Sequence, residues 1–340
     1  MRALPFAALL LAGCATTSAP LATEAPMVAA TAETDPVDTA ADAADDPAIW
    51  RNPADPSQSL VIGTDKKAGI HVYSLAGKRL SFTPAERLNN VDLRDTGARV
   101  IAAASDRADV ATAHVSLFTL DTAAAKLVPL GRFPVGAGEA YGMCLWTRAR
   151  DHALFGFVVL KDGRIDQVAI DLSAATPKVT TVRSMKLATQ SEGCVVDDRT
   201  GQLYVAEEDV GLWRFDADPS AATTATAIAR VDGKTLVADA EGLALAPSGR
   251  TGGYLVASSQ GDNAYTLYRL PGVTYAGRFR IGGGAIDGTS DTDGIDLMLG
   301  NFGPAYPRGL LVAQDGDNAP ATQNFKYVSW DAVRRALKLR

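Results

Sequence analysis

The stretch SEGCVVDDRTGQLYVAEEDVGLWRF, Ser191 to Phe215, decides the fold. Two short apolar runs flank a turn at Asp198 to Gly201, which is the pattern of a β-hairpin. Because the first strand of an antiparallel hairpin begins beside the end of the second, Glu192 and the triplet Glu207 to Asp209 are predicted to meet at one rim. Four acids at one rim repel one another unless a hard cation lies among them. The alternative for a single hairpin is a solvated acidic turn.

The start of this hairpin recurs along the chain as a short polar pair followed by an apolar strand. The six pairs are Asp46-Pro47, Asn90-Val91, Tyr141-Gly142, Glu192-Gly193, Glu241-Gly242 and Asp293-Gly294. The spacing between second residues runs from 44 (Pro47 to Val91) to 52 (Gly242 to Gly294). Units of this length, each with three or four short β-branched strands, predict an all-β fold, a six-bladed β-propeller over residues 44–340. Its first and last segments share a blade. Two β-sandwich domains would not repeat one period.

Charge and the positions of aromatic residues add limits on the partners and on the fold. The 340 residues carry 39 acids and 33 bases, a net charge of −6, with no basic tail. We therefore expect no nucleic-acid partner, and we expect a monomer. Trp50, Trp213 and Phe325 fall where blade cores need aromatic residues. A short terminal helix is predicted within Trp330 to Leu339.

The N-terminus indicates export. Residues 1–14 combine Arg2, an apolar run and Leu11-Ala12-Gly13-Cys14, which resembles a bacterial lipoprotein signal with Cys14 as the lipidated residue. A plain secretory signal is the alternative. Residues 15–43, rich in Ala, Thr, Pro and acids, are predicted to be a flexible tether. The prediction is an outer-membrane lipoprotein facing the periplasm or the cell surface, held to the membrane only by this lipid anchor. Without lipidation the protein is periplasmic or secreted.

Two further cysteines, Cys144 and Cys194, occupy equivalent positions in neighbouring repeats. This places them on adjacent inner strands. An exported chain meets an oxidising compartment, so a disulfide and a pair of buried thiols both remain open.

The repeats bring charged residues to one mouth of the channel, because inner strands begin and second strands end at the same face. Early repeats supply bases: Lys66, Lys67, Arg107 and Lys161. Later repeats supply acids beyond the hairpin: Asp239, Glu241, Asp293, Asp315 and Asp317, and Asp45 and Asp46 add acids beside the early repeats. So many oxygen ligands favour Ca²⁺ over Zn²⁺, and the three histidines show no metal spacing. Bases facing a calcium cluster would clamp an anion such as phosphate.

Motifs for a covalent nucleophile do not occur in the sequence. There is no Arg-His-Gly, no Gly-x-Ser-x-Gly elbow, and neither Cys144 nor Cys194 precedes an arginine at the spacing of a cysteine phosphatase loop. If the protein is a hydrolase, the nucleophile that fits is a metal-activated water.

Matching motifs cover the chain after residue 44, and they identify a family. They are DDPAIW (45–50), GTDKKAGIHVY (63–73), LNNVDLR (88–94), AASDR (103–107), YGMC (141–144), QSEGC (190–194), YVAEEDVGLW (204–213), ADAEGL (238–243), YLVASSQGDN (254–263), DGTSDTDGID (287–296), GLLVAQDGDN (309–318) and QNFK (323–326). The chain resembles the β-propeller phytases, the alkaline, calcium-dependent 3-phytase family of bacteria.

The resemblance implies hydrolysis of inositol hexakisphosphate (phytate), presented with calcium, to lower inositol phosphates and phosphate. Lys66, Arg107, Tyr141 and Lys161 would line the phosphate cleavage site, and Lys67 would hold a neighbouring phosphate. The implied ligands of the active-site calcium ions are Glu192, Glu208, Asp239, Glu241 and Asp293. Asp46 would bind one structural calcium ion, and Asp287, Asp317 and Asn318 another.

Two other functions are compatible with a propeller. One is a calcium-dependent lactonase or phosphotriesterase, which would not need the bases Lys66, Lys67, Arg107 and Lys161. The other is a non-catalytic lipoprotein that serves as a binding platform, which would have no reason to gather acids and bases at one mouth.

Overall fold

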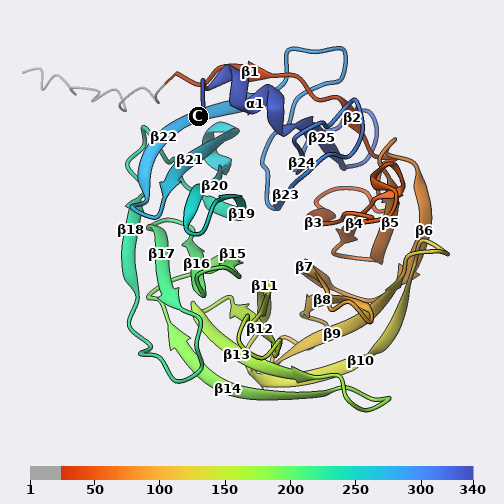
Figure 1. Ribbon diagram of the computed structural model, residues 1–340, viewed down its shortest axis with the longest axis vertical. Coiled ribbons are helices and arrows are strands. Elements are labelled where there is room, and N and C mark those ends of the chain that lie inside the picture. Colours follow the sequence, from red (N-terminus) through yellow and green to blue (C-terminus); the bar gives the residue numbers. More distant parts are fainter. Residues whose placement is uncertain (1–23, 340) are drawn as a thin grey trace, which may run out of the picture.

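The computed structural model describes residues 24–339, which form a ring of six β-sheets around a central channel (Figure 1). Each sheet contains four antiparallel strands, one sheet has a fifth strand, and we number the blades 1 to 6 in chain order. The inner strands are β3 (Ala44–Trp50), β7 (Leu88–Asp95), β11 (Ala140–Thr147), β15 (Ser191–Asp197), β19 (Ala240–Ser248) and β23 (Ile295–Leu299). The six-bladed β-propeller predicted from the repeats is confirmed.

The remaining strands follow outward in each blade. The second strands are β4 (Leu60–Asp65), β8 (Val100–Asp106), β12 (Leu154–Leu160), β16 (Gln202–Glu207), β20 (Gly252–Ser259) and β24 (Gly309–Asp315). The third strands are β5 (Gly69–Ser74), β9 (Thr112–Asp121), β13 (Arg164–Asp171), β17 (Gly211–Asp216), β21 (Ala264–Leu270) and β25 (Asn324–Ser329). The outer strands of blades 1 to 5 are β6 (Arg79–Pro84), β10 (Lys126–Ala137), β14 (Lys178–Lys186), β18 (Thr226–Arg230) and β22 (Thr274–Ile281).

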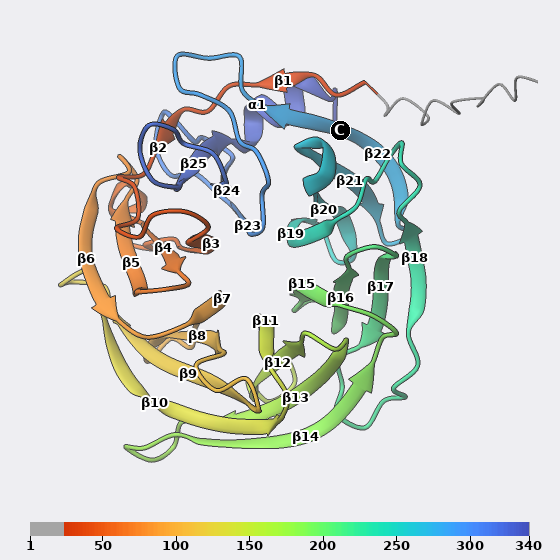
Figure 2. The ribbon, with the colours of Figure 1, turned by 180° about the vertical axis from the view of Figure 1, so that it is seen from behind.

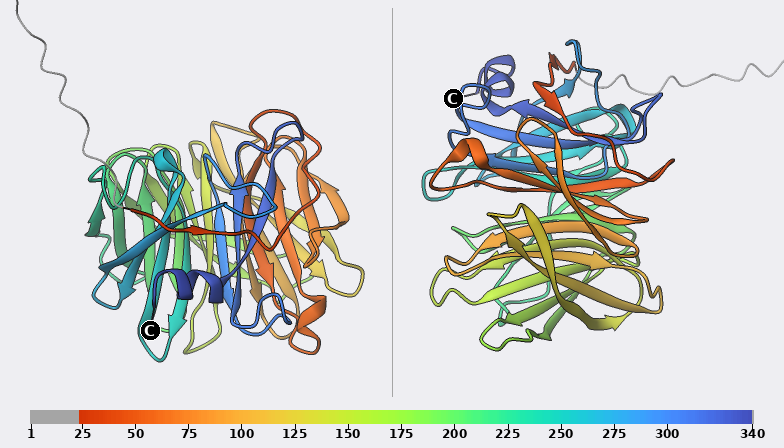
Figure 3. Two further views of the ribbon diagram at one scale, coloured as in Figure 1. Left: turned by 90° about the horizontal axis from the view of Figure 1, so that it is seen from above. Right: turned by 90° about the vertical axis from the view of Figure 1, so that its right-hand side faces the viewer.

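The N-terminal segment closes the ring. Strand β2 (Ala32–Glu33) pairs antiparallel with β25, so it forms the outer strand of blade 6. Strand β1 (Met27–Val28) pairs parallel with β22 and adds a fifth strand to blade 5. Seen edge-on, the segment crosses the rim of the disc from one blade to the next (Figure 3). The first and last segments share a blade, as predicted.

This closure corrects the predicted tether. Residues 15–43 were predicted to be flexible, yet residues 24–43 contain β1 and β2 and hydrogen-bond to blade 6. The Val37 amide donates to the Gln323 carbonyl at 2.9 Å, and the Gln323 side chain accepts from the amides of Ala43 and Ala44. The prediction failed because short pairing segments need no apolar period. Residues 15–23 and the signal at 1–14, with Cys14, lie outside the described residues.

Apolar side chains fill the space between neighbouring blades. Ile62 and Val72 of blade 1 belong to one buried cluster with Leu93 and Phe118 of blade 2. Trp50 and Phe325 are buried, which confirms both as core residues, whereas Trp213 is half-buried. The predicted terminal helix is α1 (Trp330–Ala336), which packs Trp330 and Val333 against blades 5 and 6. Two short 3-10 turns, η1 (Pro56–Gln58) and η2 (Gln260–Asp262), complete the elements. Viewed from behind, the channel is surrounded by the inner strands alone (Figure 2).

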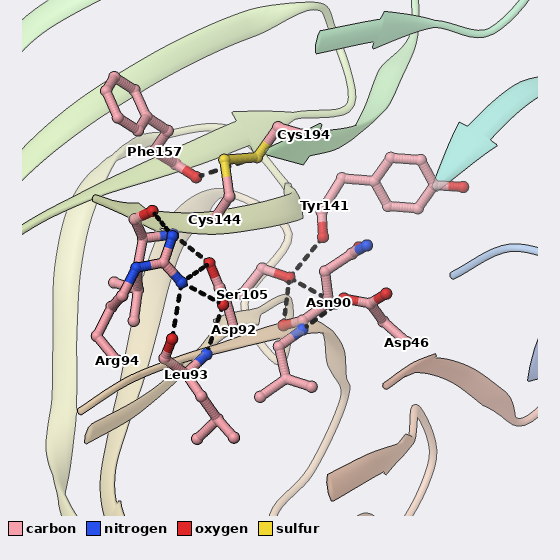
Figure 4. The surroundings of a disulfide bond; sticks show 12 residues. Asp46, Asn90, Asp92, Leu93, Arg94, Ser105, Tyr141, Cys144, Phe157 and Cys194 are labelled. Atoms are coloured by element: carbon pink, nitrogen blue, oxygen red, sulfur yellow. Dashed lines mark hydrogen bonds and ion pairs between the residues drawn. A yellow bond between two sulfur atoms is a disulfide. The ribbon is translucent and has the colours of Figure 1, made fainter. Parts of the chain in front are cut away.

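A disulfide joins Cys144 of β11 to Cys194 of β15, which decides between the two alternatives left by the sequence (Figure 4). It links the inner strands of blades 3 and 4. Tyr141 lies three residues before Cys144, and Glu192 lies two residues before Cys194. The crosslink therefore ties together the two strands whose starts carry these side chains.

We predict that replacing both cysteines by serine lowers the free energy of unfolding by about 2 to 4 kcal/mol, because the bond closes a loop in the unfolded chain. Its ends are 50 residues apart. Denaturant titration of both proteins, with and without reductant, measures this. Reductant should affect the natural sequence alone, and equal midpoints in oxidising buffer would contradict the prediction.

Candidate metal and phosphate site

In five of the six blades, the recurring polar pair lies at or beside a bulge near the start of the inner strand. Two residues between Ser191 and Cys194, and two between Ala240 and Leu243, have no partner in the regular pairing. The residues skipped there are Glu192-Gly193 and Glu241-Gly242. A bulge turns side chains out of the regular ladder, so these glutamates point away from the sheet. The sequence repeat is thus a repeat of a local backbone distortion at the channel.

The glycine in these pairs lets neighbouring inner strands touch. A Cβ atom on Gly193 would lie 2.3 Å from the Glu241 carbonyl oxygen, and one on Gly242 would lie 2.7 Å from that of Asp293. No side chain fits between these backbones. The strands can therefore approach closely around the channel, and the acids that precede the glycines are brought together.

We predict that Gly193→Ala costs about 1 to 3 kcal/mol of stability, because the added methyl group meets backbone that cannot move aside. Gly272→Ala is the matched control, since a Cβ there first meets a Thr274 side-chain atom at 4.0 Å. Denaturant unfolding measures both variants. Equal midpoints for the two variants would show that the close approach does not limit this position.

Three glutamates from blades 4 and 5 form the centre of the site. Glu192, Glu208 and Glu241 are buried, and each offers a carboxylate oxygen within 4.8 Å of the other two. At an effective dielectric constant of about 20, two unit charges at that distance repel by roughly 3.5 kcal/mol. Three such pairs approach the whole stability of a domain, about 5 to 15 kcal/mol. The three cannot all be ionised in the folded protein unless a cation lies among them.

The pKa values of these acids reflect the same repulsion between carboxylates. Burial, followed by the charges of Asp45 and Asp293, raises the pKa of Glu192 well above its ordinary value. Burial and the neighbouring Glu192 do the same for Glu241. Burial, then the charge of Asp45, raises the pKa of Asp293 from 3.8 to about 7. Without a cation, burial and mutual repulsion favour the protonated forms of these groups.

Unpaired oxygen atoms show where a cation fits. Glu208 Oε1, Glu241 Oε2 and Asp45 Oδ2 are buried without a hydrogen-bond partner among residues 24–339. Buried oxygens of this kind are costly unless something binds them. Because the donors are carboxylates rather than imidazoles or thiolates, the group suits a hard cation such as Ca²⁺.

Lys66 lies at the acidic side of this group. Its amino group contacts Asp45 Oδ1 at 3.0 Å, Asp293 Oδ2 at 3.0 Å and Asp42 Oδ1 at 2.8 Å. Burial alone would lower the pKa of Lys66, but the charges of Asp45, Asp293 and Asp42 outweigh it and raise the pKa. Lys66 is therefore a fixed cation beside the acids.

Tyr141 separates the acids from the remaining bases. The Arg107 guanidinium lies 5.3 Å from the centre of the Tyr141 ring, and Lys161 Nζ lies 5.2 Å from it. Burial, followed by the charge of Glu192, raises the pKa of the Tyr141 hydroxyl, which stays protonated. Arg107 is held by Asn89 at 2.7 Å and by Glu139 at 3.1 Å.

A cavity of about 750 Å³ opens over this arrangement. Lys66, Tyr141, Glu208, Asp239, Glu241 and Asp293 all line it. These four predicted acids thus share one cavity with the base Lys66, whereas Arg107 and Lys161 do not line it. The roles of these residues stay predictions. The segment 40–42 and the loop 316–323, which includes Asp317 and Asn318, also contribute to the lining.

Several predicted residues lie elsewhere or in another role. Glu207 of the acidic triplet accepts from Thr189 and from Trp213 Nε1 at 2.7 Å, so it braces the blade. Asp46 is buried in the channel wall, where its carboxylate accepts from the Val91 amide at 3.0 Å (Figure 4). The Lys67 side chain is exposed at the turn after β4.

Two of the three residues predicted as a second structural site, Asp287 and Asn318, contact an internal ammonium, whereas Asp317 lines the cavity. Lys326 is fully buried, and its amino group contacts Asp287, Asn318 Oδ1 at 3.1 Å, Asp315 Oδ2 at 3.2 Å and Glu33 Oε2 at 2.6 Å. The oxygen atoms of Asp287 and Asn318 thus face a cation that the chain itself supplies. Metal binding there would require Lys326 to move away, so this arrangement does not fit a resident metal ion.

Sequence reasoning missed several residues that support the site. Gln190 Nε2 donates to Glu208 Oε2 at 2.8 Å, and Gln260 Nε2 donates to Asp293 Oδ1 at 2.7 Å. Asn89 donates to Glu192, and Asp42 reaches Lys66 from the N-terminal segment. Uncharged amides carry no repeat signal, and Asp42 lies in a segment predicted to be a tether. Only its position directly before the recurring pair Asn90-Val91 could have indicated that Asn89 lies at the site.

Comparison with known proteins identifies the family. The phytase family model matches residues 3–339. The chain belongs to the phytase family. A 3-phytase of Bacillus subtilis (strain 168) is 42% identical over 329 residues, which cover 91% of this chain and 85% of that protein. A chain in a crystal structure of the mitotic checkpoint complex aligns with a TM-score of 0.50 at 13% identity, over 98% of this chain and 86% of that one. That likeness concerns the fold alone.

The raised pKa values predict how this phytase-family member responds to pH when chelator removes metal. Asp293 ionises near pH 3.8 when unfolded and near 7 when folded, so the unfolded chain holds fewer protons between these values. Rising pH therefore destabilises the fold. His71, whose pKa burial lowers to about 4, has the opposite effect, but only below about pH 6.5.

We expect the thermal midpoint in chelator to fall as pH rises from 6.5 through about 7, where His71 no longer opposes Asp293, and calcium to remove most of that fall. Differential scanning calorimetry measures both series, with Glu241→Gln as a control whose slope should be smaller. A midpoint that rises with pH in chelator would contradict the electrostatic account.

Proposed function

We propose that the protein is a calcium-dependent phosphomonoesterase that hydrolyses phytate to lower inositol phosphates and free phosphate. Phytate hydrolysis follows from membership of the phytase family and from the 42% identity to a 3-phytase. The calcium requirement and the residue roles are the finer part of the proposal. The observation that supports them is the buried cluster of Glu192, Glu208 and Glu241, with its unpaired oxygens, beside three bases and a protonated tyrosine.

The acids would hold the metal. Glu192, Glu208 and Glu241 supply the central oxygens, and Asp239 and Asp293 line the same cavity. When bound, calcium neutralises phosphate oxygens and lowers the pKa of a coordinated water. Its positive charge also removes the repulsion that raises the pKa values of these acids. The site therefore gains both reactivity and stability from the same ion.

The bases would hold the phosphate. Arg107 and Lys161, on either side of Tyr141, donate to the oxygens of the transferring group and stabilise its charge. The Tyr141 hydroxyl, kept protonated, donates a further hydrogen bond. Lys66 lines the cavity beside Asp293, so it would contact the phosphate at the side where the acids lie. Lys67, exposed outside the mouth, suits a second phosphate of the same polyanion.

Attraction of the substrate depends on this local arrangement. The chain carries a net charge of −6, which repels a polyanion at long range. A calcium complex of phytate carries less negative charge than free phytate. We propose that this complex is the substrate. Family membership favours this function over a lactonase, a phosphotriesterase or a binding platform.

Location and assembly stay predictions. We propose export, with an outer-membrane lipid anchor at Cys14, on the strength of the signal-like residues 1–14. No helix within residues 24–339 is long and apolar enough to cross a membrane. A monomer remains the expected state.

The direct test is release of phosphate from phytate with and without calcium. We expect release that requires added calcium and stops with chelator. Intact fold and calcium binding without release of phosphate would overturn the proposed reaction.

We also expect Glu208→Gln and Lys66→Ala to lower kcat by roughly 10²-fold or more while the fold survives. Glu208→Gln removes one charged metal ligand. Lys66→Ala removes a fixed positive charge and should leave the backbone nearly unchanged. Circular dichroism checks the fold, and phosphate release gives the rate. Most of the activity remaining in both variants would refute the assignment of the site.

A further inference from the structure

Asn89 touches both halves of the site. It lies on β7 at the bulge between Leu88 and Val91, and its side chain is fully buried. Its Oδ1 atom accepts from Arg107 Nη1 at 2.7 Å. Its Nδ2 atom donates to Glu192 Oε1 at 2.8 Å. One amide therefore bridges a base of the phosphate side and a carboxylate of the metal side.

The chemistry of an amide suits this bridge. Arg107 only donates hydrogen bonds, and the Glu192 carboxylate only accepts them. A residue between them must accept at one end and donate at the other, which a carboxamide does without adding a charge. An aspartate at position 89 would face Glu192 with a second negative charge, and an aliphatic side chain would leave both partners unsatisfied.

We propose that Asn89 is a positioning residue that couples the phosphate-binding arginine to the metal-binding glutamate. The inference rests on the proposed roles of Arg107 and Glu192. Asn89 fixes the orientation of the Glu192 carboxylate, because it donates to Oε1. It also holds Arg107 against the pull of Glu139, which contacts the same guanidinium at 3.1 Å.

Removing the bridge should affect both halves. Arg107 contacts Asn89 and Glu139. Without Asn89, Glu139 is the partner that remains of these two, and the guanidinium should turn toward its carboxylate. Glu192 Oε1 loses a donor in a buried position. Partners that orient ligands without touching the reacting atoms commonly change metal affinity or activity by about 10- to 100-fold when removed.

The test compares Asn89→Ala with Gln167→Ala. Gln167 is a matched control because it is also a fully buried amide that holds an arginine: its Oε1 accepts from Arg183 Nε at 3.0 Å, and its Nε2 donates to the Ala217 carbonyl. It lies on β13, the third strand of blade 3, away from the channel. Both variants lose a buried hydrogen-bonded amide, so both should unfold at lower temperature.

Calorimetric titration with calcium and steady-state kinetics with phytate separate the two roles. We expect Asn89→Ala to weaken calcium binding about tenfold or more and to lower kcat/KM by a similar factor. Gln167→Ala should leave both within about twofold. If the two variants behave alike, Asn89 is merely structural and the proposal fails.

A double-mutant cycle with Arg107→Ala checks the coupling. If Asn89 acts on phosphate through Arg107, its removal should raise the KM for phytate far less in the Arg107→Ala background than in the natural sequence. Equal fold-changes in both backgrounds would overturn that half of the proposal. If the natural protein binds calcium but releases no phosphate, the proposed function fails, while the calcium titration still decides whether Asn89 orients Glu192.

Discussion

Mutual repulsion of buried carboxylates is the constraint on which the rest of the site depends. Glu192, Glu208 and Glu241 are buried, and each offers a carboxylate oxygen within 4.8 Å of the other two. Around them Asp45 and Asp293 add further negative charge, and Lys66 supplies one fixed positive charge. The fold can tolerate this arrangement in two ways, by protonation or by binding a cation. A phosphatase gains from the second, because the same cation attracts the phosphate.

The backbone of the propeller produces the cluster. Bulges at the starts of β15 and β19 aim the glutamates into the channel, and the glycines that follow allow the next blade to approach. The ring must close for these contacts to persist. Closure comes from β2 and from Lys326, whose ion pair with Glu33 joins the N-terminal segment to β25. Stability of the rim and geometry of the site are thus linked, although they lie at opposite ends of each blade.

The repeat made most of this predictable from sequence. Its period predicts six blades, and its register predicts that Glu192, Glu241 and Asp293 share one mouth with Lys66 and Tyr141. Three features were not predictable. The role of Glu207 in bracing Trp213 depends on the direction of one side chain, which the period does not contain. The ordering of residues 24–43 depends on backbone pairing rather than composition. The bridge at Asn89 depends on an uncharged side chain whose partners come from its own blade and from blade 4.

Crystals grown with calcium, and measured for anomalous scattering, would test the central claim most directly. The account predicts a strong peak bounded by Glu192, Glu208 and Glu241, with the carboxylate oxygens turned toward it and Lys66 beside it. An empty cluster at millimolar calcium, with the three glutamates still in contact, would show that protons rather than metal balance these charges. In that case the proposed chemistry of the site would be wrong.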